Sequence, residues 1–201
     1  QMRARVVRDG PLGETNEIEA WADQLAAALA EQNEKEHESR VDNSQYDPPT
    51  AGPLATASAS EAIRAEAIAR LWHQNQKEES TGDDYIRHIE RVVALVDGDE
   101  AKAVAWLHDA LEDTGLTEGD LIAARFSPNV INAVLVLTRG DESYAEYIDS
   151  VREQGNAAAR AVKLADLRDH LRPNCPARLR PRYEAALRVL RGDRDNHLAI
   201  Y

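Results

Sequence analysis

The residues best suited to chemistry lie in the run WLHDALEDTG at 106–115. On a helix, side chains four residues apart share a face, so His108 would lie beside Glu112 and Asp109 beside Asp113. Three carboxylates then crowd the C-terminal half of the helix, where the helix dipole already presents negative charge. Each such neighbour costs about a few tenths of a kcal/mol unless a cation lies among them. The alternative is a solvated acidic face that carries an incidental histidine.

A second histidine occupies a different predicted helix. His88 lies at the edge of an apolar stripe formed by Tyr85, Ile89, Val92 and Val96. An imidazole at such an edge faces the protein interior rather than open solvent. A lone histidine in this position is usually a core residue whose hydrogen bonds are satisfied. His88 is therefore a candidate ligand only in combination with other residues.

A distant carboxylate completes the set. Asp166 follows Val162 by one helical turn in the run VKLAD, where it would be partly buried and would need a partner. Taken alone, Asp166 could simply form an ion pair with Lys163 or Arg160. Together with His88, His108 and Asp109, however, it offers two imidazoles and two carboxylates from three separate helices. Such nitrogen and oxygen ligands suit a divalent transition metal.

Helical patterns succeed one another along the part of the chain that carries these residues. Ser58 and Glu61 form a capping-box signature that opens the first helix of this domain. Thr117 and Asp120 indicate a further helix start. No strong strand alternation interrupts the pattern, so the sequence predicts an all-α helical bundle. The expected helices that follow the first one cover 83–96, 99–113, 117–125, 127–137, 141–153, 156–171 and 180–191.

The sequence divides into three parts. Residues 1–57 combine an amphipathic helix at about 15–33 with a Pro/Ser-rich linker, residues 58–192 form the main domain, and residues 193–201 form a tail. We expect the N-terminal helix to be a packing element or a contact for a homo-oligomer rather than a catalytic part.

Composition narrows the classes of function. The chain has 201 residues, 43% of them hydrophobic, and a formal net charge of −12, which makes extended nucleic acid a poor partner. A small phosphorylated ligand remains possible because a bound divalent cation inverts the local potential. Cys175 is the single cysteine, so the chain cannot form an internal disulfide or a cysteine-rich zinc site. No apolar run reaches the ~18 residues of a membrane span, and we expect a cytoplasmic protein.

Three motifs carry a family resemblance. YIRH at 85–88, HDALEDT at 108–114 and VKLAD at 162–166 resemble the HD superfamily, and most closely the hydrolase domain of RelA/SpoT proteins and small alarmone hydrolases. The resemblance covers roughly residues 60–192. It implies an HD-domain helical bundle, to which residues 1–57 add an extra helix and a linker.

The resemblance also implies roles for individual residues. The metal ligands would be His88, His108, Asp109 and Asp166, with Mn²⁺ as the metal of that family. Glu112 and Asp113 match its catalytic acidic pair. In such a site the cation lowers the pKa of water and offsets charge on phosphoryl oxygens, while a carboxylate accepts the proton. The implied reaction is removal of the 3′-pyrophosphate from guanosine tetraphosphate or pentaphosphate, (p)ppGpp.

Two features depart from the family pattern. His170 stands where the family usually has asparagine, and it could act as a hydrogen-bond donor, join the metal shell or cap a nearby acid. The basic cluster after Gln76 is reduced to Lys77 followed by two glutamates. Further candidates for substrate contact are Lys163 and Tyr144, although the helical spacing of Tyr144 is more typical of core packing.

Two other functions compete with hydrolysis. The chain could be a catalytically weak HD-fold protein that senses a nucleotide or binds a partner, or a structural bundle in which the motifs are coincidental. All four metal-ligand positions are present together with Glu112 and Asp113. This favours the enzyme, because a pseudoenzyme has no need to keep six costly polar groups together.

Overall fold

The computed structural model describes residues 60–78 and 81–193. The expected helix at 15–33, the linker and the tail from 194 onward lie outside these residues, and so does the oligomer contact assigned to that helix. The secondary structure of the described residues is helical, apart from an isolated β-bridge between Lys77 and Asp84. Among these helices, none has both the length and the apolar character required to cross a bilayer.

The helices follow the predicted order, with ends that differ by a few residues at most sites. They are α2 Glu61–Trp72, α3 Ile86–Val93, α4 Asp99–Leu107, α5 Ala110–Asp113, α6 Glu118–Ala123, α7 Pro128–Leu137, α8 Tyr144–Gln154, α9 Ala157–His170 and α10 Arg180–Arg191. The all-α class predicted from the sequence is therefore confirmed.

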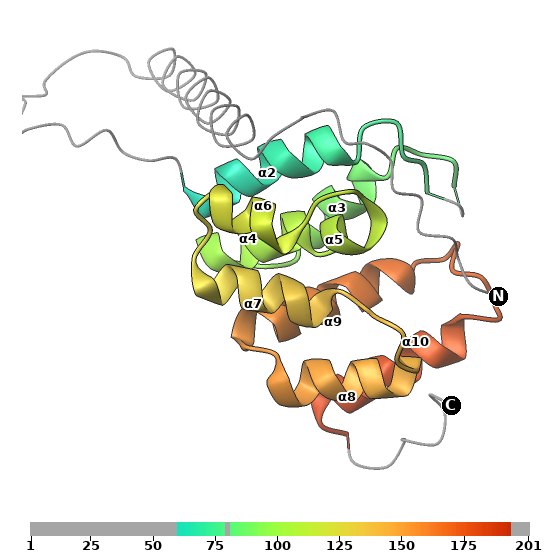
Figure 1. Cartoon of the computed structure of the whole chain (residues 1–201). Helices are drawn as coiled ribbons and strands as arrows, with labels where there is room; N and C mark the ends of the chain where they lie inside the picture. Colours follow the sequence, from blue (N-terminus) through green and yellow to red (C-terminus); the bar gives the residue numbers. More distant parts are fainter. Residues whose placement is uncertain (1–59, 79–80, 194–201) are drawn as a thin grey trace, which may run out of the picture.

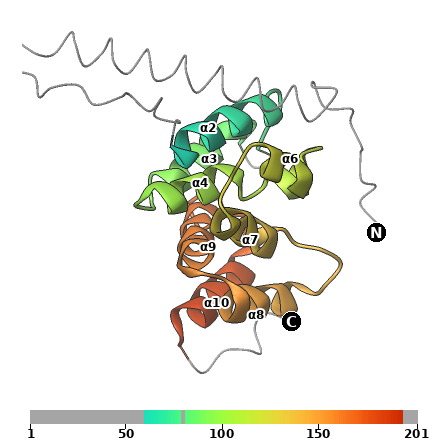
Figure 2. The same cartoon turned by 60° about the vertical axis from the view of Figure 1, so that its left-hand side comes forward.

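Helices α4 and α9 form the centre of the bundle. Helix α4 packs against α2, α3, α7 and α9, while α9 also packs against α3, α7, α8 and α10. Figures 1 and 2 show α2 at one end of the molecule and the α8–α10 pair at the opposite end. Both central helices bury several alanines, and small side chains let helix backbones approach closely. The two helices nearest the candidate residues are thus each packed against at least four other helices.

Local capping sets where the helices begin. Ser60, not the expected Ser58, is the N-cap of α2, and its hydroxyl accepts a hydrogen bond from Ile63 N. Glu61 does not complete a capping box; its carboxylate instead accepts from the backbone N–H and hydroxyl of Ser127, the N-cap of α7. Glu61 therefore ties the start of α2 to the start of α7. The capping box of Thr117 with Asp120 is confirmed at α6.

The continuous helix expected over 99–113 is wrong. The chain breaks into α4 and α5 at His108 and Asp109. The Nδ1 atom of His108 lies 2.7 Å from the carbonyl oxygen of Ala105, which an uninterrupted helix would pair with the backbone N–H of Asp109. The histidine side chain thus replaces a backbone hydrogen bond and opens the helix at the HD pair.

Two neighbouring residues on α6 test how the core is held. Leu121 is fully buried, whereas the adjacent Ile122 is 59% exposed. Replacing Leu121 with Ala should lower the free energy of unfolding by about 2–5 kcal/mol because it leaves a cavity. Replacing Ile122 with Ala should change it by less than about 0.5 kcal/mol. Urea unfolding followed by circular dichroism measures both, and equal effects would contradict this description of the core.

Candidate metal centre

Four residues predicted as metal ligands meet where α3, α4 and α9 converge. His88 comes from α3, His108 and Asp109 from the break after α4, and Asp166 from α9. His88 Nε2 lies 3.6 Å from Asp109 Oδ2 and 3.5 Å from Asp166 Oδ1, and His108 Nε2 lies 3.1 Å from Asp109 Oδ2. Both imidazoles and the Asp166 carboxylate are buried. Residues up to 78 positions apart in the chain therefore share one small polar centre.

The polar atoms at this centre fit a divalent cation. His88 Nε2, His108 Nε2 and Asp166 Oδ1 are buried, and no hydrogen-bond partner satisfies them within the described part of the chain. Ligands about 2.0–2.2 Å from one ion are separated by roughly 3.0–3.5 Å when they are adjacent. The spacings at this centre are close to that range, so a cation would satisfy groups that are otherwise costly to bury.

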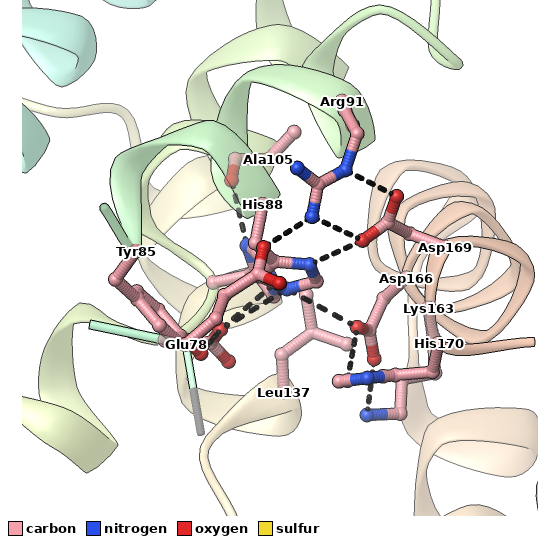
Figure 3. Close-up of polar contacts among 12 residues, drawn as sticks. Glu78, Tyr85, His88, Arg91, Ala105, Leu137, Lys163, Asp166, Asp169 and His170 are labelled. Carbon is pink, nitrogen blue, oxygen red and sulfur yellow. Dashed lines mark hydrogen bonds and ion pairs between the residues drawn. The ribbon is translucent and has the colours of Figure 1, made fainter. Parts of the chain in front are cut away.

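Hydrogen bonds from the opposite ring nitrogens aim the imidazoles inward. His88 Nδ1 lies 2.7 Å from Asp169 Oδ2, and His108 Nδ1 lies 2.7 Å from the Ala105 carbonyl oxygen. Both partners are acceptors, so each Nδ1 carries a hydrogen, and each Nε2 can offer a lone pair to a cation once it is deprotonated. Figure 3 shows His88 held between Asp169 on one side and Asp166 on the other.

The charges at the centre favour a positive occupant. Burial lowers the pKa of His88, but the nearby carboxylates of Asp109, Asp169 and Asp166 outweigh it and raise the pKa to about 10, so the surroundings of this imidazole stabilise positive charge. Burial likewise opposes ionisation of Asp166, yet Lys163 foremost among its neighbours holds the pKa of that carboxyl well below its usual range. The pKa of Asp109 is also far below its usual range because His108 and His88 outweigh its burial. Both carboxylates are therefore ionised, and a cation is well suited to lie between them.

Behind His88 lies an ion-pair network that the sequence did not indicate. The guanidinium of Arg91 donates to both oxygens of Asp169, at 2.7 and 3.1 Å, and also to Glu78. Arg172 Nη2 lies 3.4 Å from Glu78 Oε2. This network fixes the carboxylate that orients His88. Its sequence signal is a repeated spacing, since Arg91 follows His88 by three residues just as Asp169 follows Asp166.

The predicted acidic pair stands on the short helix α5 at the rim of the centre. Glu112 Oε2 accepts a hydrogen bond from the backbone N–H of Arg139, 3.2 Å away. Loss of surrounding water, followed by the negative charges of Asp109 and Glu112, raises the pKa of Asp113 to about 6. Loss of water also raises the pKa of Glu112. Both carboxylates keep contact with solvent, and Asp113 is suited to exchange a proton near neutral pH.

A cavity of about 260 Å³ opens beside the centre. His108, Asp109, Asp166 and the acidic pair all line it, together with the predicted substrate contacts Tyr144, Lys163 and His170. Tyr144 is mostly buried, as core packing requires, and also faces this cavity. Its hydroxyl has no hydrogen-bond partner in the described residues. Arg139, which the sequence did not single out, lies over the Tyr144 ring at 5.9 Å and adds a positive charge to the cavity wall.

The two predicted lysines lie in different settings. Lys163 Nζ is 2.8 Å from Asp166 Oδ2 and 4.9 Å from the centre of the Tyr147 ring. Lys77 is not part of the cavity lining; its side chain is 60% exposed and its Nζ pairs with Asp84 Oδ1 at 2.5 Å. The structure thus brings Lys163 to the centre but not Lys77, whose contact with substrate stays a prediction.

Comparison with known protein families and with curated proteins gives no match to the sequence. The fold, by contrast, is similar to the solved structure of a metazoan SpoT ortholog that hydrolyses ppGpp and plays a role in starvation responses. The TM-score is 0.56 with 20% sequence identity, over 75% of this chain and 94% of that one. The chain has the HD-domain fold. In this bundle the four residues predicted from the sequence as metal ligands lie together.

The first test concerns Asp169, whose carboxylate orients His88. Asp169→Asn should weaken binding of Mn²⁺ or Co²⁺ by about 10- to 100-fold, because an amide orients the imidazole less firmly and can present a donor to it. Isothermal titration calorimetry on the full chain measures the affinity. Asp97→Asn is the matched control, since Asp97 is an exposed carboxylate that does not line the cavity. Equal affinities for wild type and Asp169→Asn would contradict the positioning role.

The second test uses the raised pKa of Asp113 in protein stripped of metal ions. A carboxyl whose pKa rises on folding costs stability once it ionises, so this cost is absent near pH 4 and complete above about pH 6. Asp113→Asn should therefore raise the unfolding temperature at pH 7, with a gain of about 1 kcal/mol or less because solvent screens the exposed side chain. At pH 4 the gain over wild type should vanish. A gain that is larger at pH 4 than at pH 7 would reverse the sign and refute the assignment.

Proposed function

We propose that this chain is a metal-dependent phosphohydrolase that acts on a small phosphorylated nucleotide. The most specific version of the proposal is a (p)ppGpp 3′-pyrophosphohydrolase. The observation that carries the proposal is the set of inward-facing, buried atoms of His88, His108 and Asp166, which have no hydrogen-bond partner in the described part of the chain. They adjoin a cavity that also contains a solvent-accessible acidic pair. The ppGpp-hydrolysing structure with a similar fold supports the substrate class.

The proposed cofactor is a divalent cation, Mn²⁺ by resemblance, held by His88, His108, Asp109 and Asp166. When bound, such a cation lowers the pKa of water and offsets negative charge on phosphoryl oxygens. The protein orients the two imidazoles through their Nδ1 atoms and keeps both carboxylates ionised. Tyr85 adds a further restraint, because its hydroxyl donates to Asp109 Oδ2 at 2.5 Å.

The acidic pair supplies the proton acceptor. The carboxylate of Asp113 takes a proton from the water that attacks the phosphorus bonded to the 3′ oxygen. The bond from phosphorus to the 3′ oxygen breaks, pyrophosphate keeps the new hydroxyl group, and the 3′ oxygen leaves with the proton that Asp113 returns. A pKa of about 6 leaves Asp113 mostly ionised at neutral pH while keeping it basic enough to accept that proton. Glu112 is held by the backbone N–H of Arg139 and faces the same cavity, where it orients the water.

The cavity wall provides the contacts for the substrate. Lys163 and Arg139 offer positive charge to phosphate, His170 also faces the cavity, and Tyr144 offers a ring face to the base. The net charge of −12 supports a small nucleotide rather than extended nucleic acid as the partner, and we place the reaction in the cytoplasm. Lys77 would reach phosphate only after releasing Asp84.

The test is a substrate panel for the metal-reconstituted full chain beside His108→Ala. Guanosine tetraphosphate, other nucleotides and dinucleotide cofactors are incubated with each protein, and released phosphate and pyrophosphate are measured. Pyrophosphate from the tetraphosphate, dependent on Mn²⁺ and lost in His108→Ala, is the expected result. Release from another nucleotide would preserve the phosphohydrolase and change its substrate.

Asp113→Asn separates the enzyme from a nucleotide-sensing or partner-binding protein. The variant should retain its metal and lose about 10²- to 10⁴-fold in turnover, as expected for removal of a positioned proton acceptor. Metal content is measured by atomic emission and turnover by pyrophosphate release. Wild-type turnover in the variant would contradict the role of Asp113. No turnover by the metal-loaded wild type across the panel would favour the sensing protein.

A further inference from the structure

His170 lies within reach of the metal centre from the end of α9. It follows Asp166 by one helical turn, and its Nε2 atom is 3.0 Å from Asp166 Oδ1. The same Oδ1 atom lies 3.5 Å from His88 Nε2. The donor atoms of His88, Asp166 and His170 all lie within 4.8 Å of one another, as do those of His88, His108 and Asp109. The centre thus consists of two overlapping triads that share His88.

The contact between His170 and Asp166 is an ion pair only when His170 is protonated. Asp166 Oδ1 is buried and has no hydrogen-bond partner in the described residues, although His170 Nε2 is close to it. The other oxygen of Asp166 already accepts from Lys163 Nζ at 2.8 Å. His88 Nε2 is likewise buried and unpaired. The donor atoms of His88, Asp166 and His170 thus lie around a common point, an arrangement that suits the ligands of an ion.

Packing fixes the plane of the His170 ring. The ring stacks on Tyr183 of α10, with centroids 5.0 Å apart and an interplanar angle of 22°. Its other neighbour is the His88 ring, also with centroids 5.0 Å apart. Figure 3 shows His170 beside Asp166, next to Lys163. The side chain is nevertheless 41% exposed, so substitutions at this position should be tolerated by the fold.

We propose that His170 is a further metal ligand, which binds through Nε2 beside Asp166 and His88. The inference rests on the cation of the proposed function and deepens it. The shell then contains three imidazoles and two carboxylates. Each added imidazole favours Co²⁺ and Zn²⁺ over Mn²⁺, for which carboxylate ligands are better suited. The ratio of Co²⁺ affinity to Mn²⁺ affinity is therefore set in part by His170.

Two substitutions distinguish ligation from packing. His170→Phe keeps a ring that can stack on Tyr183 and removes both nitrogens, whereas His170→Asn removes the ring and keeps a polar side chain. The full-length proteins are stripped of metal and titrated with Co²⁺ and with Mn²⁺ by calorimetry. X-ray absorption at the cobalt edge then counts the coordinated imidazoles. Neither measurement depends on turnover.

The expected result is three imidazoles in the wild type and two in both variants. Co²⁺ binding should weaken by at least about ten-fold in both variants, with a smaller change for Mn²⁺. Two imidazoles in the wild type, or a loss of affinity in His170→Asn but not in His170→Phe, would overturn the inference while leaving the proposed phosphohydrolase intact. A wild-type protein that binds no metal would overturn both.

Discussion

A carboxylate that must stay ionised where little water reaches it governs the structure around the candidate site. Burial alone would make Asp166 neutral, since removal of a carboxylate from water costs several kcal/mol. Lys163, from the same helix, compensates at 2.8 Å, and His88 approaches from α3. The other oxygen faces His88 and His170 but has no hydrogen-bond partner among the described residues, so further compensation comes from the side on which α3, α4 and α9 converge. The close packing of the alanine-rich central helices is what brings those side chains within reach.

The break between α4 and α5 serves the same requirement. In a continuous helix, His108 and Asp109 would point about 100° apart around the axis, so one of them would face away from the centre. The structure instead lets His108 take the Ala105 carbonyl with Nδ1 and point Nε2 inward, while Asp109 Oδ2 lies within 3.6 Å of both imidazoles. A backbone hydrogen bond is exchanged for a side-chain hydrogen bond, and two adjacent residues thereby face one point.

The fold and the gathering of ligands were predictable because they depend on local patterns. Helical periodicity placed His88 and Asp166 on inward-facing positions, and the HD-type motifs linked them to His108. The break at 108–109 was not predictable, because helix propensity continues through HDALED and only the ring position of His108 interrupts it. Asp169 was missed because its partner Arg91 is 78 residues away and on another helix. The start of α2 at Ser60 was not predictable either, because Glu61, expected to complete a capping box with Ser58, pairs with Ser127, 66 residues further on.

Under the proposed function, the same charges couple the cation to the substrate. Lys163 is engaged by Asp166, Lys77 by Asp84, and a guanidinium nitrogen of Arg139 donates to the carbonyl oxygen of Glu142 at 3.1 Å. At the rim, Glu112 and Asp113 repel phosphate when they are ionised. Binding of a phosphorylated nucleotide therefore relies on the cation for most of its charge compensation, since these basic side chains already have partners. A pocket of this kind selects for a substrate whose scissile phosphate reaches the metal and whose remaining phosphates stay few or exposed to solvent.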